Sequence, residues 1–149
     1  MLVALRIRHF VLIEELELRL EPGFNVITGE TGAGKSILVD ALSLVFGHRV
    51  GSDLVRPGAD EAEVEALFDI PADSKVVTAL RESGLGDEGE LVIRRVVHRS
   101  GRSRAYVNGR LCSARELVLL SRTTRLRSRT RSVSTRSTVQ LRRRCSTKT

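Results

Sequence analysis

The sequence has few aromatic residues and no long apolar run. Its 149 residues include four phenylalanines, one tyrosine and no tryptophan, so a core has to be built from leucine, valine, isoleucine and alanine. No apolar stretch reaches the roughly 20 residues of a membrane span. The opening 2–20 segment alternates with charge and lacks the pattern of a signal peptide. We therefore expect a cytoplasmic chain with no membrane partner.

Cysteines are equally rare. Cys112 and Cys145 lie in different contexts, and their spacing is not that of metal ligands. We interpret both as buried or incidental thiols in a reducing compartment.

Acidic residues are absent from the last part of the chain. Residues 1–121 carry 15 basic and 18 acidic residues, whereas residues 122–149 carry 10 basic residues and no acid. Twelve of those last residues are serine or threonine, and they show no apolar periodicity. Such a segment cannot bury enough apolar surface to offset the entropy lost on ordering. The sequence predicts a folded unit over 1–121 and a disordered basic tail over 122–149.

The most informative segment reads GETGAGKS and has the spacing of a phosphate-binding loop. Glycines let backbone N–H groups approach phosphate oxygens, a lysine reaches the β- and γ-phosphates, and a serine hydroxyl holds Mg²⁺. We predict an ATP and Mg²⁺ site with Ser36 as the metal ligand and no catalytic residue. The residues assigned to nucleotide contact are Gly29, Glu30, Thr31, Gly32, Ala33, Gly34, Lys35 and Ser36.

The flanks of this loop support the assignment. Residues 24–28 form a short apolar run typical of a buried strand, and apolar residues recur at helical spacing over 37–45 before Gly47. A strand, a glycine-rich loop and a helix N-terminus together form an anion site. A glycine-rich turn between core elements is the weaker alternative.

The remaining pattern predicts an α/β fold whose sheet is mixed, with antiparallel N-terminal strands and a parallel element at the phosphate loop. Asn108-Gly109 predicts a tight hairpin, and Ser113 with Glu116 predicts a capping box. Periodicity predicts strands at 2–9, 12–20, 63–70 and 91–97 and a short helix at 73–83.

Five arginines gather in the second half of the folded part. Without interleaved aromatics, we expect them to be solvent-facing strand residues and not a nucleic-acid surface. They are Arg94, Arg95, Arg99, Arg102 and Arg104. The acids at 53 and 60–65 are likewise expected to form a solvated face.

The chain resembles the RecN family of bacterial DNA repair proteins, relatives of the SMC proteins with ABC-type ATPase heads. Over residues 2 to about 120, the segments that carry the resemblance are LRIRHFVLIEELELRLEPGFNVITGETGAGKS, GHRVGSDLVRPGADEAEVEALFDI and LVIRRVVHRSGRSRAYVNGR. His9 departs from the asparagine usual in the opening strand.

The resemblance implies the first lobe of a P-loop ATPase head that acts at DNA double-strand breaks in the bacterial nucleoid. It implies ATP and DNA as partners and a homodimer through the heads of the full-length relative. The signature motif, Walker B carboxylates and switch histidine of that family are not found after residue 36. We therefore expect negligible turnover, and a truncated or frame-shifted chain whose tail is out of frame.

Two alternatives stay open. One is an ATPase of a RecF-like or transporter-like branch. The other is a small DNA-binding protein in which the basic tail is functional and the phosphate loop is vestigial.

Overall fold

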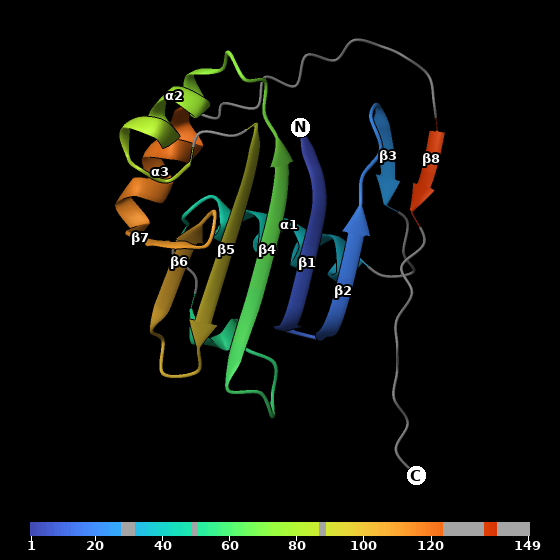
Figure 1. The fold of residues 1–149 in the computed structure, drawn as a ribbon. Coiled ribbons are helices and arrows are strands. Elements are labelled where there is room, and N and C mark those ends of the chain that lie inside the picture. The colour runs from blue at the N-terminus through green and yellow to red at the C-terminus, as the bar shows by residue number, and fades with distance from the viewer. Residues whose placement is uncertain (28–31, 49–50, 87–88, 124–135, 140–149) are drawn as a thin grey trace.

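The structure, a computed structural model, describes residues 1–27, 32–48, 51–86, 89–123 and 136–139. Within these ranges six strands form one antiparallel sheet in the order β2-β1-β4-β5-β6-β7 (Figure 1). Its strands are β1 (Leu2–Phe10), β2 (Ile13–Arg19), β4 (Glu61–Asp69), β5 (Glu90–His98), β6 (Ser103–Val107) and β7 (Arg110–Cys112).

One face of this sheet is buried, as the alternation of apolar and polar residues predicts. In β4 the predicted apolar set Val64, Ala66 and Phe68 is at most 1% exposed. Alternate residues of β1 and β5 are buried on the same face, because successive side chains in a strand point to opposite faces. The core therefore lies on one side of the sheet.

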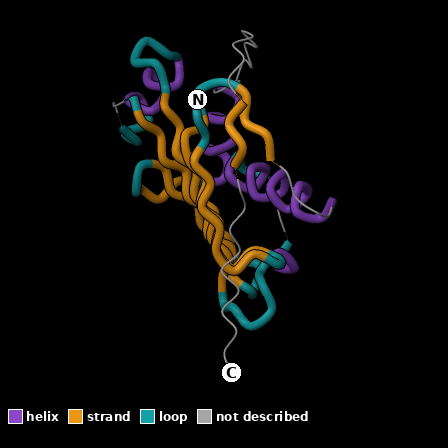
Figure 2. Tube along the Cα trace, turned by 90° about the vertical axis from the view of Figure 1, so that its right-hand side faces the viewer, coloured by secondary structure: helices purple, strands orange, loops and turns teal. Residues whose placement is uncertain are grey.

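Helix α1 (Gly32–Val45) covers that buried face. Seen along the sheet in Figure 2, the strands form a layer and α1 lies against one side of it. The residues of α1 that are buried recur at spacings of three and four, which places them on one stripe of the helix. They are Ile37, Leu38, Ala41, Leu44 and Val45.

Two further helices pack against each other near the β5 and β6 side of the sheet (Figure 1). They are α2 (Lys75–Glu82) and α3 (Ala114–Thr123); a 3₁₀ turn, η1 (Ser52–Leu54), lies in the loop after α1. The Ser74 hydroxyl caps α2 by accepting from the Val77 N–H at 3.3 Å. Leu80 and Leu117 are fully buried and anchor the two helices.

The turn between β6 and β7, at the edge of the sheet, has the residues that the sequence predicts. Asn108 and Gly109 both take positive φ, 48° and 78°, as a two-residue hairpin requires. The Asn108 side chain also accepts from the Val92 N–H at 2.8 Å and donates to the Leu85 carbonyl at 3.1 Å. The predicted hairpin is confirmed, and its asparagine ties β5 to the loop after α2.

The strand that leads into the phosphate loop belongs to a separate sheet. β3 (Phe24–Ile27) pairs in parallel with β8 (Arg136–Val139), from Phe24 opposite Arg136 to Ile27 opposite Val139. Figure 1 shows this pair beyond the β2 edge of the main sheet. The parallel element at the loop was predicted, but the structure gives it a sheet of its own instead of a place in one mixed sheet.

Two short pieces of the tail belong to described elements, and the disorder predicted for the tail stays a prediction. Residues 122–123 end helix α3, and residues 136–139 form β8. Composition cannot reveal such pairing, because a strand partner distant in sequence supplies the hydrogen bonds. Residues 124–135 and 140–149, including Cys145, lie outside the described residues, so disorder there stays a prediction.

Candidate nucleotide-binding site

The candidate loop lies between β3 and the N-terminus of α1. β3 ends at Ile27 and α1 begins at Gly32, so the predicted strand and helix flank the motif as the sequence indicates. Gly32, Ala33, Gly34, Lys35 and Ser36 are the first five residues of α1. Gly29, Glu30 and Thr31 lie outside the described residues.

The start of α1 has the electrostatics of an anion site. The first amides of a helix have no carbonyl partner within it, and the aligned peptide dipoles leave partial positive charge there. The first turn of α1 contains no acidic residue that would neutralise this charge. Ser36, at the end of the motif, is exposed to solvent. This end of α1 therefore suits a phosphate group.

The far end of α1 is fixed against α3. The Gly47 N–H donates to the Leu44 carbonyl and the His48 N–H to the Ser43 carbonyl, both at 3.1 Å, and Gly47 takes φ of 88°. This is a glycine C-cap. A Cβ on Gly47 would lie 2.8 Å from Cγ2 of Val118. The cap and this close approach hold the helix that carries Lys35.

The turn before β3 is fixed by one asparagine. The Asn25 side chain donates to the Glu21 carbonyl at 2.8 Å and accepts from the Glu21 N–H at 3.1 Å. Gly23 takes φ of 110° within this turn, a conformation that favours glycine. These hydrogen bonds fix the conformation of the turn through which the chain enters β3.

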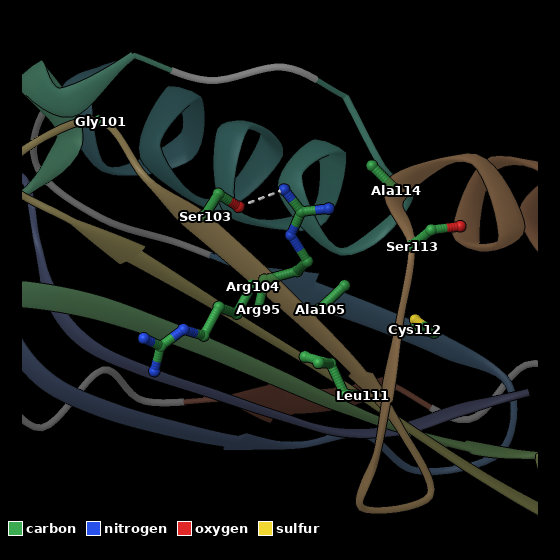
Figure 3. Close-up of a pocket in the computed structure, with 9 residues that line it drawn as sticks. All are labelled: Arg95, Gly101, Ser103, Arg104, Ala105, Leu111, Cys112, Ser113 and Ala114. Atoms are coloured by element: carbon green, nitrogen blue, oxygen red, sulfur yellow. Dashed lines mark hydrogen bonds between the residues drawn. The ribbon is translucent and has the colours of Figure 1, made fainter.

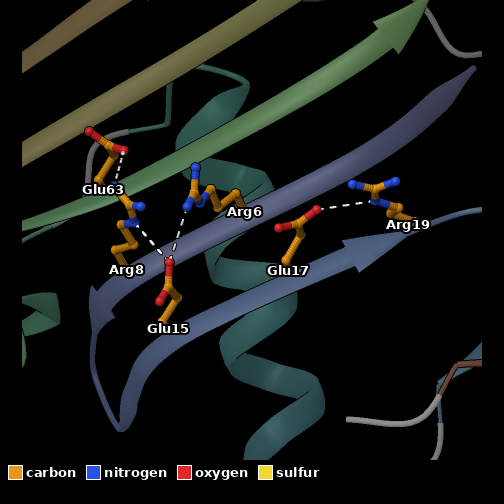
Figure 4. Close-up of polar contacts among 6 residues, drawn as sticks. All are labelled: Arg6, Arg8, Glu15, Glu17, Arg19 and Glu63. Carbon is orange, nitrogen blue, oxygen red and sulfur yellow. Dashed lines mark hydrogen bonds and ion pairs between the residues drawn. The ribbon is translucent and has the colours of Figure 1, made fainter. Parts of the chain in front are cut away.

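Charged residues on the outer face of the main sheet pair with one another (Figure 4). Glu15 accepts from Arg6 and Arg8, each at 3.2 Å, and Glu63 lies 3.9 Å from Arg8 and 3.7 Å from Arg94. The hydrogen bonds from Arg8 and Arg6 hold the pKa of the Glu15 carboxyl below its ordinary value. Glu15 and Glu63 thus belong to an ion network on this face, and for Glu63 that is the expected solvated position.

No group of histidine, cysteine and acidic side chains in the described part of the chain could hold a metal ion. His98 is exposed, and its Nδ1 lies 2.9 Å from the Ser100 hydroxyl.

The prediction that all five clustered arginines face solvent is wrong for Arg95. Arg94 does lie on the outer face, with its guanidinium carbon 4.5 Å from the centre of the Tyr106 ring. Arg95 is only 5% exposed. It shares the inner face of β5 with Leu91, Ile93 and Val97, and that odd-numbered alternation was the signal that could have revealed it.

Two further features concern the thiol of Cys112 and the length of the helices. Cys112 is half-buried and unpaired, and burial is the main cause that raises the pKa of its thiol. Among the described helices, none is long and apolar enough to cross a membrane.

Comparisons with known proteins agree with this geometry. The family model of the AAA domain matches residues 4–144. The chain is 42% identical over 120 residues to the DNA repair protein RecN of Haemophilus influenzae, covering 78% of this chain and 22% of that protein. It is 42% identical over 123 residues to RecN of Bacillus subtilis, covering 82% and 21%.

A solved structure supports the fold. The chain matches an SMC ATPase structure, from a report on ATP-driven dimerization and DNA-stimulated activation, with a TM-score of 0.66 and 28% identity. The match covers 82% of this chain and 78% of that one. The predicted fold class, a lobe of an SMC-type P-loop ATPase head, is confirmed.

The match to the AAA domain extends past residue 121, into the tail for which the sequence showed no resemblance. The chain spans about a fifth of the length of the curated relatives. On this evidence the chain belongs to the AAA domain family and is similar to part of the RecN proteins.

Proposed function

We propose that residues 29–36 bind the phosphates of ATP together with Mg²⁺, in a chain whose role is in DNA repair. The observation that carries this proposal is the start of α1 inside the motif, with β3 ending shortly before it in the sequence. The motif then lies where first-turn amides converge on an anion. The absence of an acid from that first turn adds support.

Each motif residue has a separate task in this proposal. The backbone N–H groups from Gly29 to Gly34 surround the phosphates, since glycine leaves room for their approach. Lys35 neutralises the β- and γ-phosphates, and the Ser36 hydroxyl holds Mg²⁺. The bound metal neutralises charge on the phosphate oxygens. Glu30, Thr31 and Ala33 shape the loop.

The RecN relatives and the SMC ATPase support three wider proposals. The role in DNA repair rests on the names of the relatives. DNA as a partner and pairing through the heads rest on the SMC structure, whose report concerns dimerization and stimulation by DNA. We infer that hydrolysis by this chain alone is negligible, because Walker B carboxylates and a second protomer are needed to complete such a site.

A calorimetric titration tests the site. With Mg·ATP, and separately with Mg·ADP, we expect saturable heat for the chain and a loss of affinity of at least about tenfold for Lys35→Ala, since a charge-assisted contact to phosphate is removed. Lys75→Ala is the matched control, because Lys75 is an exposed lysine in α2. It should bind as the unaltered chain does.

Two results would overturn the proposal. One is an absence of heat with both nucleotides from folded protein, and the other is equal affinity in the two lysine variants. Phosphate release that requires Mg²⁺ and disappears in Lys35→Ala would keep the site but contradict the inference of negligible turnover.

The similarity to RecN over most of the chain favours this proposal over a RecF-like or transporter-like ATPase. All three share the phosphate loop, so nucleotide binding alone does not separate them.

A further inference from the structure

Arg95 is a buried cation whose charge has no acidic partner among the described residues. Its side chain points from the inner face of β5 and is 5% exposed. Nη2 donates to the Ser103 hydroxyl at 2.6 Å, whereas Nε and Nη1 are buried without a hydrogen-bond partner. Buried polar groups are almost always paired, and a buried charge is costly unless an opposite charge accompanies it.

The Arg95 guanidinium borders a pocket of about 530 Å³ between β6, β7 and the start of α3. Figure 3 shows the guanidinium beside Ser103 on one side of β6, with the Arg104 side chain directed to the other. Cys112, Ser113 and Ala114 line the opposite part of the pocket. The volume exceeds that of a single small ion, so the pocket admits a group attached to a larger molecule.

The charges around the pocket favour an anion. α3 is ten residues long, and its N-terminus, with partial positive charge, lines the pocket. Glu116 is exposed and already engaged: its carboxylate accepts from the Ser113 N–H at 2.7 Å, and its own N–H donates to the Ser113 hydroxyl at 3.2 Å. This confirms the predicted capping box.

Cys112 does not supply the missing negative charge. Burial first, and then the Glu116 carboxylate, raise the pKa of its thiol, so it is a neutral group at neutral pH. The Ser103 hydroxyl accepts from Arg95 and keeps its own proton to donate. Arg95 and Ser103 thus line the pocket, Arg95 Nη2 is bonded to the hydroxyl, and Arg95 Nε and Nη1 have no acceptor among the described residues.

We propose that this pocket is a second anion site, separate from the phosphate loop, in which Arg95 and Ser103 bind one oxyanion at the N-terminus of α3. The oxyanion is a phosphate or carboxylate group, because both accept several charge-assisted hydrogen bonds. The geometry gives Ser103 a bridging place between the guanidinium and the anion.

Arginine Nε–H resonances in NMR spectra test the proposal. The full chain with Lys35→Ala is titrated with sodium phosphate, and separately with sodium acetate, at constant ionic strength, so that the phosphate loop does not contribute. We expect a saturable shift of one Nε–H resonance that is absent when Arg95→Met is added. Phosphate alone, acetate alone or both causing the shift identifies the oxyanion. Arg94→Met, on the outer face, should keep the response.

A second variant covers the possibility that Arg95→Met does not fold. Ser103→Ala should weaken the apparent affinity about tenfold, as expected for one lost charge-assisted contact. Unchanged affinity in Ser103→Ala overturns the proposal. So does the lack of a saturable shift with either anion, or an equal shift in folded Arg95→Met.

Discussion

The main sheet and the β3–β8 pair are stabilised in different ways. The six strands of the main sheet pair with neighbours over up to nine residues and bury one continuous apolar face. The β3–β8 pair joins four residues to four, and an isolated two-stranded sheet is marginal in water. The large sheet therefore rests on packing, and the small one rests on a pairing between segments distant in sequence.

The candidate phosphate loop connects these two regions. Its helix, α1, is anchored in the core through Ala41, Leu44 and Val45, each 0% exposed. Its strand, β3, belongs to the small pair. A site of this kind takes its position mainly from the helix. Changes to the core should therefore disturb nucleotide binding more than changes to β8.

The largest effect is expected in the core. Phe68 in β4 is 1% exposed, and its ring centre lies 5.9 Å from that of Phe46. Phe68→Ala removes buried apolar area and leaves a cavity, so we expect a loss of about 3–5 kcal/mol in the free energy of unfolding. Urea denaturation followed by circular dichroism measures it. A loss below about 1 kcal/mol would mean that the face over α1 is not the main source of stability.

A smaller effect is expected from removing β8. A chain that ends at residue 123 loses the partner of β3 but keeps every strand of the main sheet. The short pair loses a few hydrogen bonds with a net contribution of about 0.5–1 kcal/mol each, so we expect the unfolding free energy to fall by about 2 kcal/mol. The same denaturation experiment checks it.

Nucleotide binding and DNA binding of the truncated chain give two further measurements. Mg·ATP binding should persist, because α1 is held by the core. DNA binding should lose much of its salt dependence, because nine of the ten basic residues of 122–149 are removed. Equal DNA binding by the truncated chain would contradict the alternative that the tail is the functional part. Loss of folding would show that β8 belongs to the core.

The same contrast explains which features the sequence could predict. The apolar alternation of β4, the Asn108-Gly109 hairpin and the Ser113–Glu116 capping box depend on residues close in sequence, and each is confirmed. The β3–β8 pairing depends on more than a hundred intervening residues, so no local signal indicated it.

Arg95 shows a different limit. Charge led to the expectation of a solvent-facing residue, although its strand parity placed it with Leu91 and Ile93 on the inner face. Residue type and alternation disagreed, and alternation prevailed because pairing fixes the register of the whole strand. For the phosphate loop, the sequence predicted the strand and helix that flank it, whereas the nucleotide contacts stay a prediction.

The smallest effect concerns the outer face of the main sheet and appears only as pH falls. Because Arg8 and Arg6 lower the pKa of Glu15 in the folded chain, the ionised carboxylate favours folding. That contribution is present above the pKa of the unfolded chain, about 4.3, and is lost as pH falls through the lower folded value. Glu15→Gln should therefore lower stability at pH 7 and flatten its decline between about pH 5 and 3.

Glu17→Gln, which removes one exposed pair with Arg19, should alter the profile less, because a single exposed pair contributes little. Parallel profiles for the unaltered chain and Glu15→Gln would mean that the outer-face network contributes nothing to folding, which would leave the buried face as the only stabilised side of the sheet.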